Sequence, residues 1–167
     1  MGADPERLII FHSLSKRSNL PGLRSGFAAS GPQNIAALKQ LRNYAGTPLP
    51  LPLQRAATRV WNDEDHVAEN RALYGAKFEV ADQIFGDVDG YVPPQAGFFL
   101  WLPVADGEAA TLKLWKASGV RCLPGAYLGR DADGQNPGHG YIRVAMVAPI
   151  DDMTRGLQQI RRHLYED

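Results

Sequence analysis

The sequence has one cysteine, no net charge at neutral pH and no long apolar run. One cysteine cannot form an internal disulfide bond, which favours a reducing compartment and a cytoplasmic location. The 18 Lys and Arg residues balance the 18 Asp and Glu residues, so we expect neither a nucleic acid nor a membrane as a partner. No apolar stretch approaches the about 20 residues that cross a bilayer as a helix. These absences leave a globular chain of 167 residues, long enough for one domain or slightly more.

Metal and thiol chemistry are not indicated either. The histidines show no metal-ligand spacing, and the loop Gly129–Gly140 lacks the ligand spacing and terminal glutamate of an EF-hand. We therefore expect no metal site. Cys122 is interpreted as a packing residue rather than a nucleophile, and His12 as a packed imidazole.

The most informative stretch is Leu8–Ala28, in which an apolar run is followed by hydroxyl groups, one lysine and one arginine. The run Leu8–Phe11 predicts a buried strand. Hydroxyl groups and the fixed fork of an arginine are suited to hold a phosphate. A lysine desolvated beside another cation loses its proton more readily and can then attack an aldehyde. A generic basic turn or anion-binding loop is the alternative.

This stretch resembles the lysine signature of fold type I, pyridoxal-phosphate-dependent aminotransferases of classes I and II. The signature reads Ser-x-Ser-Lys and then, after a short variable run, Pro-Gly-x-Arg-x-Gly. Both parts are complete here, at Ser13–Lys16 and Pro21–Gly26. The resemblance implies that Lys16 is the catalytic lysine and binds pyridoxal 5'-phosphate covalently. It also implies that Ser13 and Arg24 bind the cofactor phosphate, with Ser15 as a weaker candidate.

A second motif, Tyr141–Ala145, resembles the strand on which this family carries a substrate-binding arginine. The planar fork of an arginine matches a carboxylate with two parallel hydrogen bonds, and its permanent charge fixes the orientation of the substrate. The resemblance therefore implies that Arg143 binds the α-carboxylate of the substrate. A surface ion pair is the alternative. Gln95–Trp101 and Val120–Tyr127 also resemble family segments, which we interpret as scaffolding for this arginine.

Three further segments are similar to the N-succinyldiaminopimelate aminotransferases of bacterial lysine biosynthesis: Phe11–Asn19, Trp61–Glu64 and Val147–Pro149. The similarity implies amino transfer between glutamate, which becomes 2-oxoglutarate, and an N-succinylated oxo acid. Amino acids and 2-oxo acids are then the substrates. Two alternatives stay open: another fold type I reaction, such as that of a β-lyase, and a non-catalytic, stand-alone interaction domain.

Members of this family carry a long portion before their lysine, including the groups that hold the cofactor ring. We therefore expect this chain to be the C-terminal portion of a longer enzyme, with the missing N-terminal portion as a partner. On its own the chain should bind the cofactor weakly and be inactive. We also expect self-association, with a homodimer as the state of the intact enzyme.

The expected fold class is α/β: a remnant of the large-domain sheet of a fold type I aminotransferase, followed by a small α+β domain. Alternating prolines in Thr47–Pro52 predict an extended connection, and we place the domain junction there. Residues 1–50 would belong to the large cofactor-binding domain and residues 51–167 to the small C-terminal domain. Helical spacing predicts Leu112 and Trp115 on the inward face of one helix. Predicted helices span residues 32–45, 53–61, 62–85, 108–118 and 150–164, and predicted strands span residues 98–102, 120–123 and 141–147.

Overall fold

The computed structural model describes residues 4–166, so the outer ends of the two expected domains, residues 1–3 and 167, lie outside it. The chain forms two compact units, the first ending at Arg71 and the second beginning at Ala72. Helices and two small antiparallel sheets alternate along the chain, which confirms the predicted α/β class. Within the described residues, no helix is long and apolar enough to span a membrane.

The first unit is built on an antiparallel hairpin of β1 (Ile10–Ser13) and β2 (Gly26–Ala29). The predicted strand is therefore present, but the prediction that it is buried was wrong. The side chains from Leu8 to Phe11 are all at least 46% exposed. An apolar run is buried only where other elements cover it, and a sheet of two strands offers little neighbouring surface.

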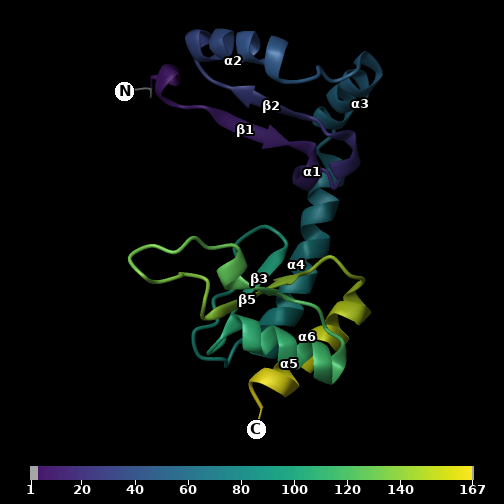
Figure 1. The fold of residues 1–167 in the computed structure, drawn as a ribbon. Helices are drawn as coiled ribbons and strands as arrows, with labels where there is room; N and C mark the ends of the chain where they lie inside the picture. Colours follow the sequence, from purple (N-terminus) through teal and green to yellow (C-terminus); the bar gives the residue numbers. More distant parts are fainter. Residues whose placement is uncertain (1–3, 167) are drawn as a thin grey trace. The chain divides into compact units, whose positions relative to one another are not determined.

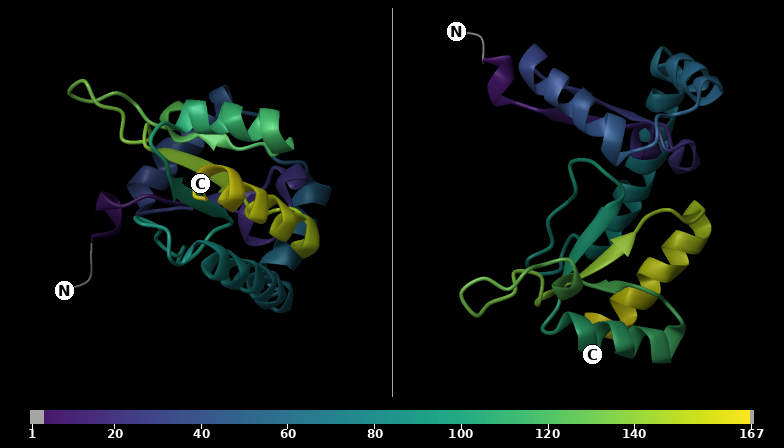
Figure 2. Two further views of the ribbon diagram at one scale, coloured as in Figure 1. Left: turned by 90° about the horizontal axis from the view of Figure 1, so that it is seen from below. Right: turned by 45° about the horizontal axis from the view of Figure 1, so that its top comes forward.

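Short helical turns and one longer helix flank this hairpin. A short turn of helix, α1 (Leu14–Arg17), and a 3-10 turn, η2 (Pro21–Leu23), connect its two strands. Another 3-10 turn, η1 (Pro5–Arg7), precedes it, and α2 (Pro32–Ala45) lies along it (Figures 1 and 2). The Glu6 carboxylate accepts hydrogen bonds from two backbone N–H groups in the first turn of α2, at 3.0 and 3.1 Å. A carboxylate there pairs with backbone N–H groups that have no partner within the helix, and its negative charge interacts favourably with the positive end of the helix dipole.

The division between the two units falls within a helix, and the proline-rich stretch lies inside the first unit. The predicted extended connection Thr47–Pro52 ends at Pro50, because Leu51 and Pro52 already form the first turn of α3 (Leu51–Trp61). Residues 47–50 join α2 to α3 within the first unit. The next helix, α4 (Asp65–Phe85), is continuous across the division. Its residue Val67 is buried in the first unit, whereas Phe85 belongs to the core of the second. The packing partners of one long helix thus set the division, and a break in secondary structure does not.

The second unit carries a three-stranded antiparallel sheet in the order β3-β5-β4. Helices α5 and α6 pack on one face of this sheet (Figure 2). The predicted strands and helices are present with small shifts at their ends, except that the short strand begins at Leu123 rather than Val120. The elements are β3 (Phe99–Pro103), α5 (Gly107–Ser118), β4 (Leu123–Pro124), a 3-10 turn η3 (Gly125–Tyr127), β5 (Tyr141–Ala145) and α6 (Ile150–Leu164).

The core of the chain lies between this sheet and α4, α5 and α6. Its fully buried side chains include Phe85, Leu100, Leu102, Leu114, Ile142, Met146 and Ile160. On α5 the prediction of the inward face was wrong, because Leu114 faces the core while Leu112 and Trp115 are 52% and 46% exposed. Leu112 and Leu114 lie about 200° apart around a helix, so both cannot face the sheet. The Trp115 ring instead lies 4.4 Å below the guanidinium of Arg121.

Candidate active site

The lysine turn of the sequence is a single turn of helix that follows β1. Ser13 ends the strand with extended backbone and caps this turn, because its Oγ accepts a hydrogen bond from the backbone N–H of Ser15 at 3.0 Å. The two hydroxyl oxygens lie 2.9 Å apart, and Ser13 Oγ also lies 3.3 Å from the carbonyl oxygen of Ser25. The structure therefore brings the two predicted serines together at the start of α1.

Leu14 holds this turn against the rest of the first unit. Its side chain is fully buried, and its backbone N–H donates to the Ser25 carbonyl oxygen at 3.1 Å across the hairpin. Its own carbonyl oxygen accepts from Ser18 and Leu20, both at 3.2 Å. The backbone around the lysine is thus tied to both ends of the hairpin connection.

Lys16 lies in the middle of α1 and is exposed. Lys77, on α4, has different surroundings from those of Lys16. Lys77 is half-buried, and its Nζ donates to the Met146 carbonyl oxygen at 2.9 Å and lies 5.3 Å from the Tyr74 ring. Its amine therefore has a structural role within the second unit.

Arg24 follows η2 in a left-handed backbone conformation, with φ of 51° and ψ of 34°. Asn19, five residues earlier, is also left-handed, with φ of 53°. Such a conformation costs a non-glycine residue about 1–3 kcal/mol and is typically retained at functional segments. The Arg24 guanidinium donates to the carbonyl oxygen of Pro21 at 3.0 Å. The connection that follows the lysine is thus held in a strained shape with its arginine exposed.

Arg24 also lines a cleft of about 800 Å³ between the hairpin and α2. Lys39 and Arg42 of α2 line the same cleft, together with apolar side chains such as Phe27 and Leu38. Among the described residues, Lys16 and the two serines do not line it. The cleft is therefore positively charged but separate from the lysine turn.

Arg143 stands at the centre of the second unit's sheet, where β5 pairs with β3 on one side and β4 on the other. Its neighbours Ile142 and Val144 are buried in the core, so its side chain lies on the opposite face. There the guanidinium is half-buried and lies 4.3 Å from the centre of the Phe99 ring. This stacking restricts the guanidinium plane while leaving its N–H groups to bind a carboxylate.

Two glycines show why the flanking segments have their sequence. Gly97, before the aromatic residues of β3, has φ of +87°, a conformation that glycine adopts without strain. A Cβ on Gly125 would lie 2.9 Å from the Tyr141 carbonyl oxygen, so only glycine permits this approach of η3 to β5. Both glycines shape the backbone on either side of the arginine strand.

The prediction that His12 is a packed imidazole was wrong, because the residue is exposed and lines the cleft beside α2. His12 lies with its ring 5.2 Å from that of Trp61 and 5.9 Å from that of Phe27. Burial raises the pKa of the Cys122 thiol from its ordinary 9.0 to about 11, which disfavours a nucleophilic thiolate. In the part of the chain that the structure describes, no cluster of three His, Cys, Asp or Glu residues could hold a metal ion.

The sequence reasoning did not identify Arg17, which the structure places in an ion pair with Glu64. Glu64 belongs to an exposed acidic run at the start of α4, in which the Asp63 carboxylate accepts from the backbone N–H of Asp65 at 3.0 Å. The signal available in the sequence was the arginine directly after the lysine, but its partner lies 47 residues away.

A family model described as aminotransferase class I and II matches residues 1–160. A relative from Streptomyces rimosus, named 4-dedimethylamino-4-oxo-anhydrotetracycline transaminase OxyQ, is 33% identical to this chain. The match covers 88% of this chain and 40% of the relative's length. An aminotransferase from Neisseria meningitidis is 40% identical, with a TM-score of 0.89 over 94% of this chain and 40% of its own. A probable N-succinyldiaminopimelate aminotransferase from Thermus thermophilus is 26% identical, with a TM-score of 0.83 over 98% of this chain and 44% of its own.

The chain thus spans about 40% of the length of such relatives. Within that span, the family model covers the lysine turn, the connection with the left-handed arginine and the strand of Arg143. The similarity of sequence and the similarity of fold point to the same family, and they confirm the resemblance that the lysine signature indicated. This chain belongs to the class I and II aminotransferases.

Proposed function

We propose that this chain carries the catalytic lysine and the substrate-binding arginine of a pyridoxal-phosphate-dependent aminotransferase. The observation that carries this proposal is the lysine turn. A capped and anchored turn of helix presents the exposed Lys16 after two serines that lie within hydrogen-bond distance of each other. We also propose that residues 1–50 belong to the larger, cofactor-binding domain of the intact enzyme.

The residues present fit this cofactor by their donor chemistry. Members of the family depend on pyridoxal phosphate. Ser13 and Ser15 provide hydroxyl groups and Arg24 a guanidinium, all of which can bind phosphate oxygens. Lys16 provides the primary amine, and no carboxylate belongs to this set. When bound, pyridoxal phosphate supplies an electron sink for the substrate's α-carbon.

Three residues of the chain would have separate roles in binding the cofactor and the substrate. Lys16 Nζ would hold the cofactor and later move a proton to and from the substrate's α-carbon. Arg143 would bind the α-carboxylate and so orient the reacting carbon. Phe99, on which the guanidinium lies, would limit the directions from which the carboxylate can approach.

For the substrate we propose glutamate and 2-oxoglutarate as one pair and N-succinyldiaminopimelate with its oxo acid as the other. The similarity of three segments to that group of enzymes supports this choice, as does the name of the Thermus thermophilus neighbour. The Streptomyces rimosus relative is named for a tetracycline intermediate. The lysine and arginine motifs are therefore compatible with more than one substrate, and the succinyl group has to be tested directly.

The proposed partners are the remaining portion of the enzyme and a second copy, and the proposed location is the cytoplasm. The exposed apolar side chains of Ile10, Phe11 and Phe27 support a covering partner, because such a group is rarely left in water.

A single-turnover experiment on the intact protein tests the reaction. Glutamate should convert the bound cofactor to its amine form, with loss of the absorption band of the lysine-bound cofactor, and N-succinyldiaminopimelate should do the same. Formation of pyruvate and ammonia from a sulfur amino acid would instead favour a β-lyase. No spectral change with any amino acid would favour a non-catalytic domain.

A further inference from the structure

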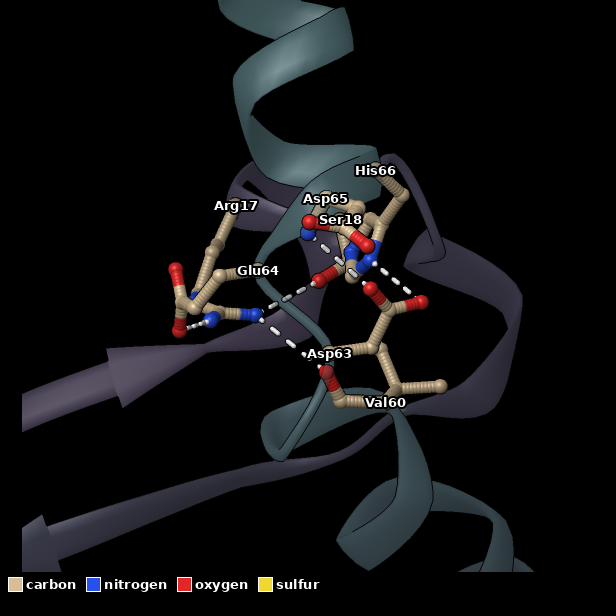
Figure 3. A network of polar contacts seen from close by, with 7 residues as sticks. All are labelled: Arg17, Ser18, Val60, Asp63, Glu64, Asp65 and His66. Carbon is tan, nitrogen blue, oxygen red and sulfur yellow. Dashed lines mark hydrogen bonds and ion pairs between the residues drawn. The ribbon is translucent and has the colours of Figure 1, made fainter.

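The residue after the lysine, Arg17, is the most enclosed charged side chain of the lysine turn. Its side chain is 10% exposed. One guanidinium nitrogen donates to the Glu64 carboxylate, and the other lies 3.5 Å from the Val60 carbonyl oxygen and 3.2 Å from Ser18 Oγ. The guanidinium carbon lies 4.9 Å from the centre of the Trp61 ring. Figure 3 shows this side chain extending from α1 to the connection between α3 and α4.

These contacts use what an arginine offers and a lysine does not. The planar guanidinium presents several N–H groups in a fixed fork and can also stack on an aromatic ring. A charge that is nine-tenths enclosed is costly unless it is paired and hydrogen-bonded. Arg17 therefore stays in this position only while the Glu64 carboxylate and the end of α3 remain in place.

The connection between α3 and α4, which Arg17 contacts, is itself held in place. The Asp63 carboxylate accepts from the backbone N–H of Asp65 at 3.0 Å and lies 3.1 Å from Nδ1 of His66 (Figure 3). The Glu64 carbonyl oxygen accepts from the backbone N–H of Val67 at 3.1 Å, and the Val67 side chain is 2% exposed. The connection after α3 is thus a rigid attachment point.

The lysine turn needs such an attachment. Helix α1 has only four residues, and a helix of this length is not stable on its own. Leu14 fixes its first residue by burial, and Arg17 fixes its last through contacts to residues 43 to 47 positions away in the sequence. Lys16 lies between these two attachments.

We propose that Arg17 is a positioning residue for Lys16. Through Glu64 and Val60 it holds α1 in the orientation in which the lysine amine meets the cofactor. The inference rests on the proposed function, because it assumes that Lys16 is the cofactor-binding lysine. The contacts themselves do not depend on that assumption.

The experiment measures covalent capture of pyridoxal phosphate by the cofactor-free intact protein. Samples are reduced with borohydride at successive times, and the modified lysine is identified by peptide mass spectrometry. The variant Arg17→Met should capture the cofactor about 10- to 100-fold more slowly, since a displacement of 1 Å at a reacting group can cost about 100-fold. Arg17→Lys keeps the charge but loses the fork, so its capture rate should lie between those of the wild type and Arg17→Met.

Glu64→Gln provides the second arm. Its side chain is 72% exposed, so the substitution removes the carboxylate without opening the interior. It should slow capture in the same direction as Arg17→Met, and the double variant should be no slower than Arg17→Met, because both changes act on one contact. If Arg17→Met does not fold, Glu64→Gln and Arg17→Lys carry the test. The matched control is Arg155→Met on α6, which removes a surface pair with Asp152 and should leave capture unchanged.

A merely structural role would give a different pattern. It would lower the thermal midpoint while folded molecules captured the cofactor at the wild-type rate. It would also leave unchanged the absorption maximum of the lysine-bound cofactor and the pH at which that band titrates, whereas positioning predicts a shift in both. Wild-type capture and spectra in folded Arg17→Met would overturn the proposal and leave the aminotransferase assignment intact. No capture at Lys16 in the wild type would overturn both.

Discussion

The two units hold the two candidate site residues, Lys16 and Arg143, by different means. In the second unit, Arg143 stands on a sheet whose other face is packed against three helices, and side chains such as Phe85 and Ile142 are fully buried. In the first unit, Lys16 stands on one turn of helix beside a hairpin whose Phe11 is 71% exposed. The substrate-binding candidate therefore rests on a core, and the cofactor-binding candidate rests on a few specific contacts.

This difference explains what each site tolerates. A packed core transmits the loss of any large side chain, because its neighbours cannot relax fully. The lysine turn depends instead on a few hydrogen bonds and an ion pair of Ser13, Leu14 and Arg17. We therefore expect stability to be most sensitive to substitutions in the second unit, and cofactor capture to those in the first.

The largest effect on stability is expected for Phe85→Ala. Phe85 is fully buried beside the rings of Tyr91 and Tyr165, and truncating such a residue typically costs about 3–5 kcal/mol. Phe11→Ala is the matched control, since an exposed phenylalanine should change the free energy of unfolding by less than about 0.5 kcal/mol. Urea unfolding of both variants measures the difference. Equal losses would show that the hairpin is as well packed as the second unit.

Arg143→Lys should lower the activity towards amino acids rather than the stability of the fold. The substitution keeps the positive charge but loses the fork that binds a carboxylate with two hydrogen bonds. We expect a loss of about 2–4 kcal/mol in kcat/KM for amino acids in the intact enzyme, with little change in cofactor binding. Arg121→Lys, at the surface stack with Trp115, is the control and should be neutral. Near-wild-type kinetics for Arg143→Lys would place this arginine outside the site.

A smaller effect is expected from Cys122 at high pH. Burial raises the pKa of its thiol from 9.0 to about 11, so the fold favours the protonated form. The resulting stabilisation is complete below pH 9 and is lost as the pH rises through 11. Thermal unfolding between these pH values should show a steeper decline for the wild type than for Cys122→Ala. Parallel declines would mean that the thiol does not contribute.

The sequence was sufficient where a local pattern decides the structure. Pro32 and Gly46 delimit α2, and the three- and four-residue spacing of Met153, Leu157 and Ile160 predicts the buried face of α6. The lysine and arginine motifs were also visible, because each depends on residue types at fixed spacing.

Features that depend on distant residues could not be predicted in this way. The exposure of Leu8–Phe11 depends on which elements cover the hairpin, and an apolar run alone does not show that. The prediction for α5 was wrong because it placed the large Trp115 side chain in the core. In the structure Ala110 and Leu114 are buried, whereas Trp115 is exposed. The pair of Arg17 and Glu64 could not be found because its two residues meet only in the folded chain.

The lysine that captures pyridoxal phosphate in the intact protein can be identified directly. Borohydride reduction followed by peptide mapping should place the adduct on Lys16, and Lys16→Ala should abolish it. Lys113→Ala, on the exposed side of α5, should capture the cofactor as the wild type does. An adduct that survives in Lys16→Ala, on Lys77 or any other lysine, would contradict the assignment of the lysine turn as the cofactor site.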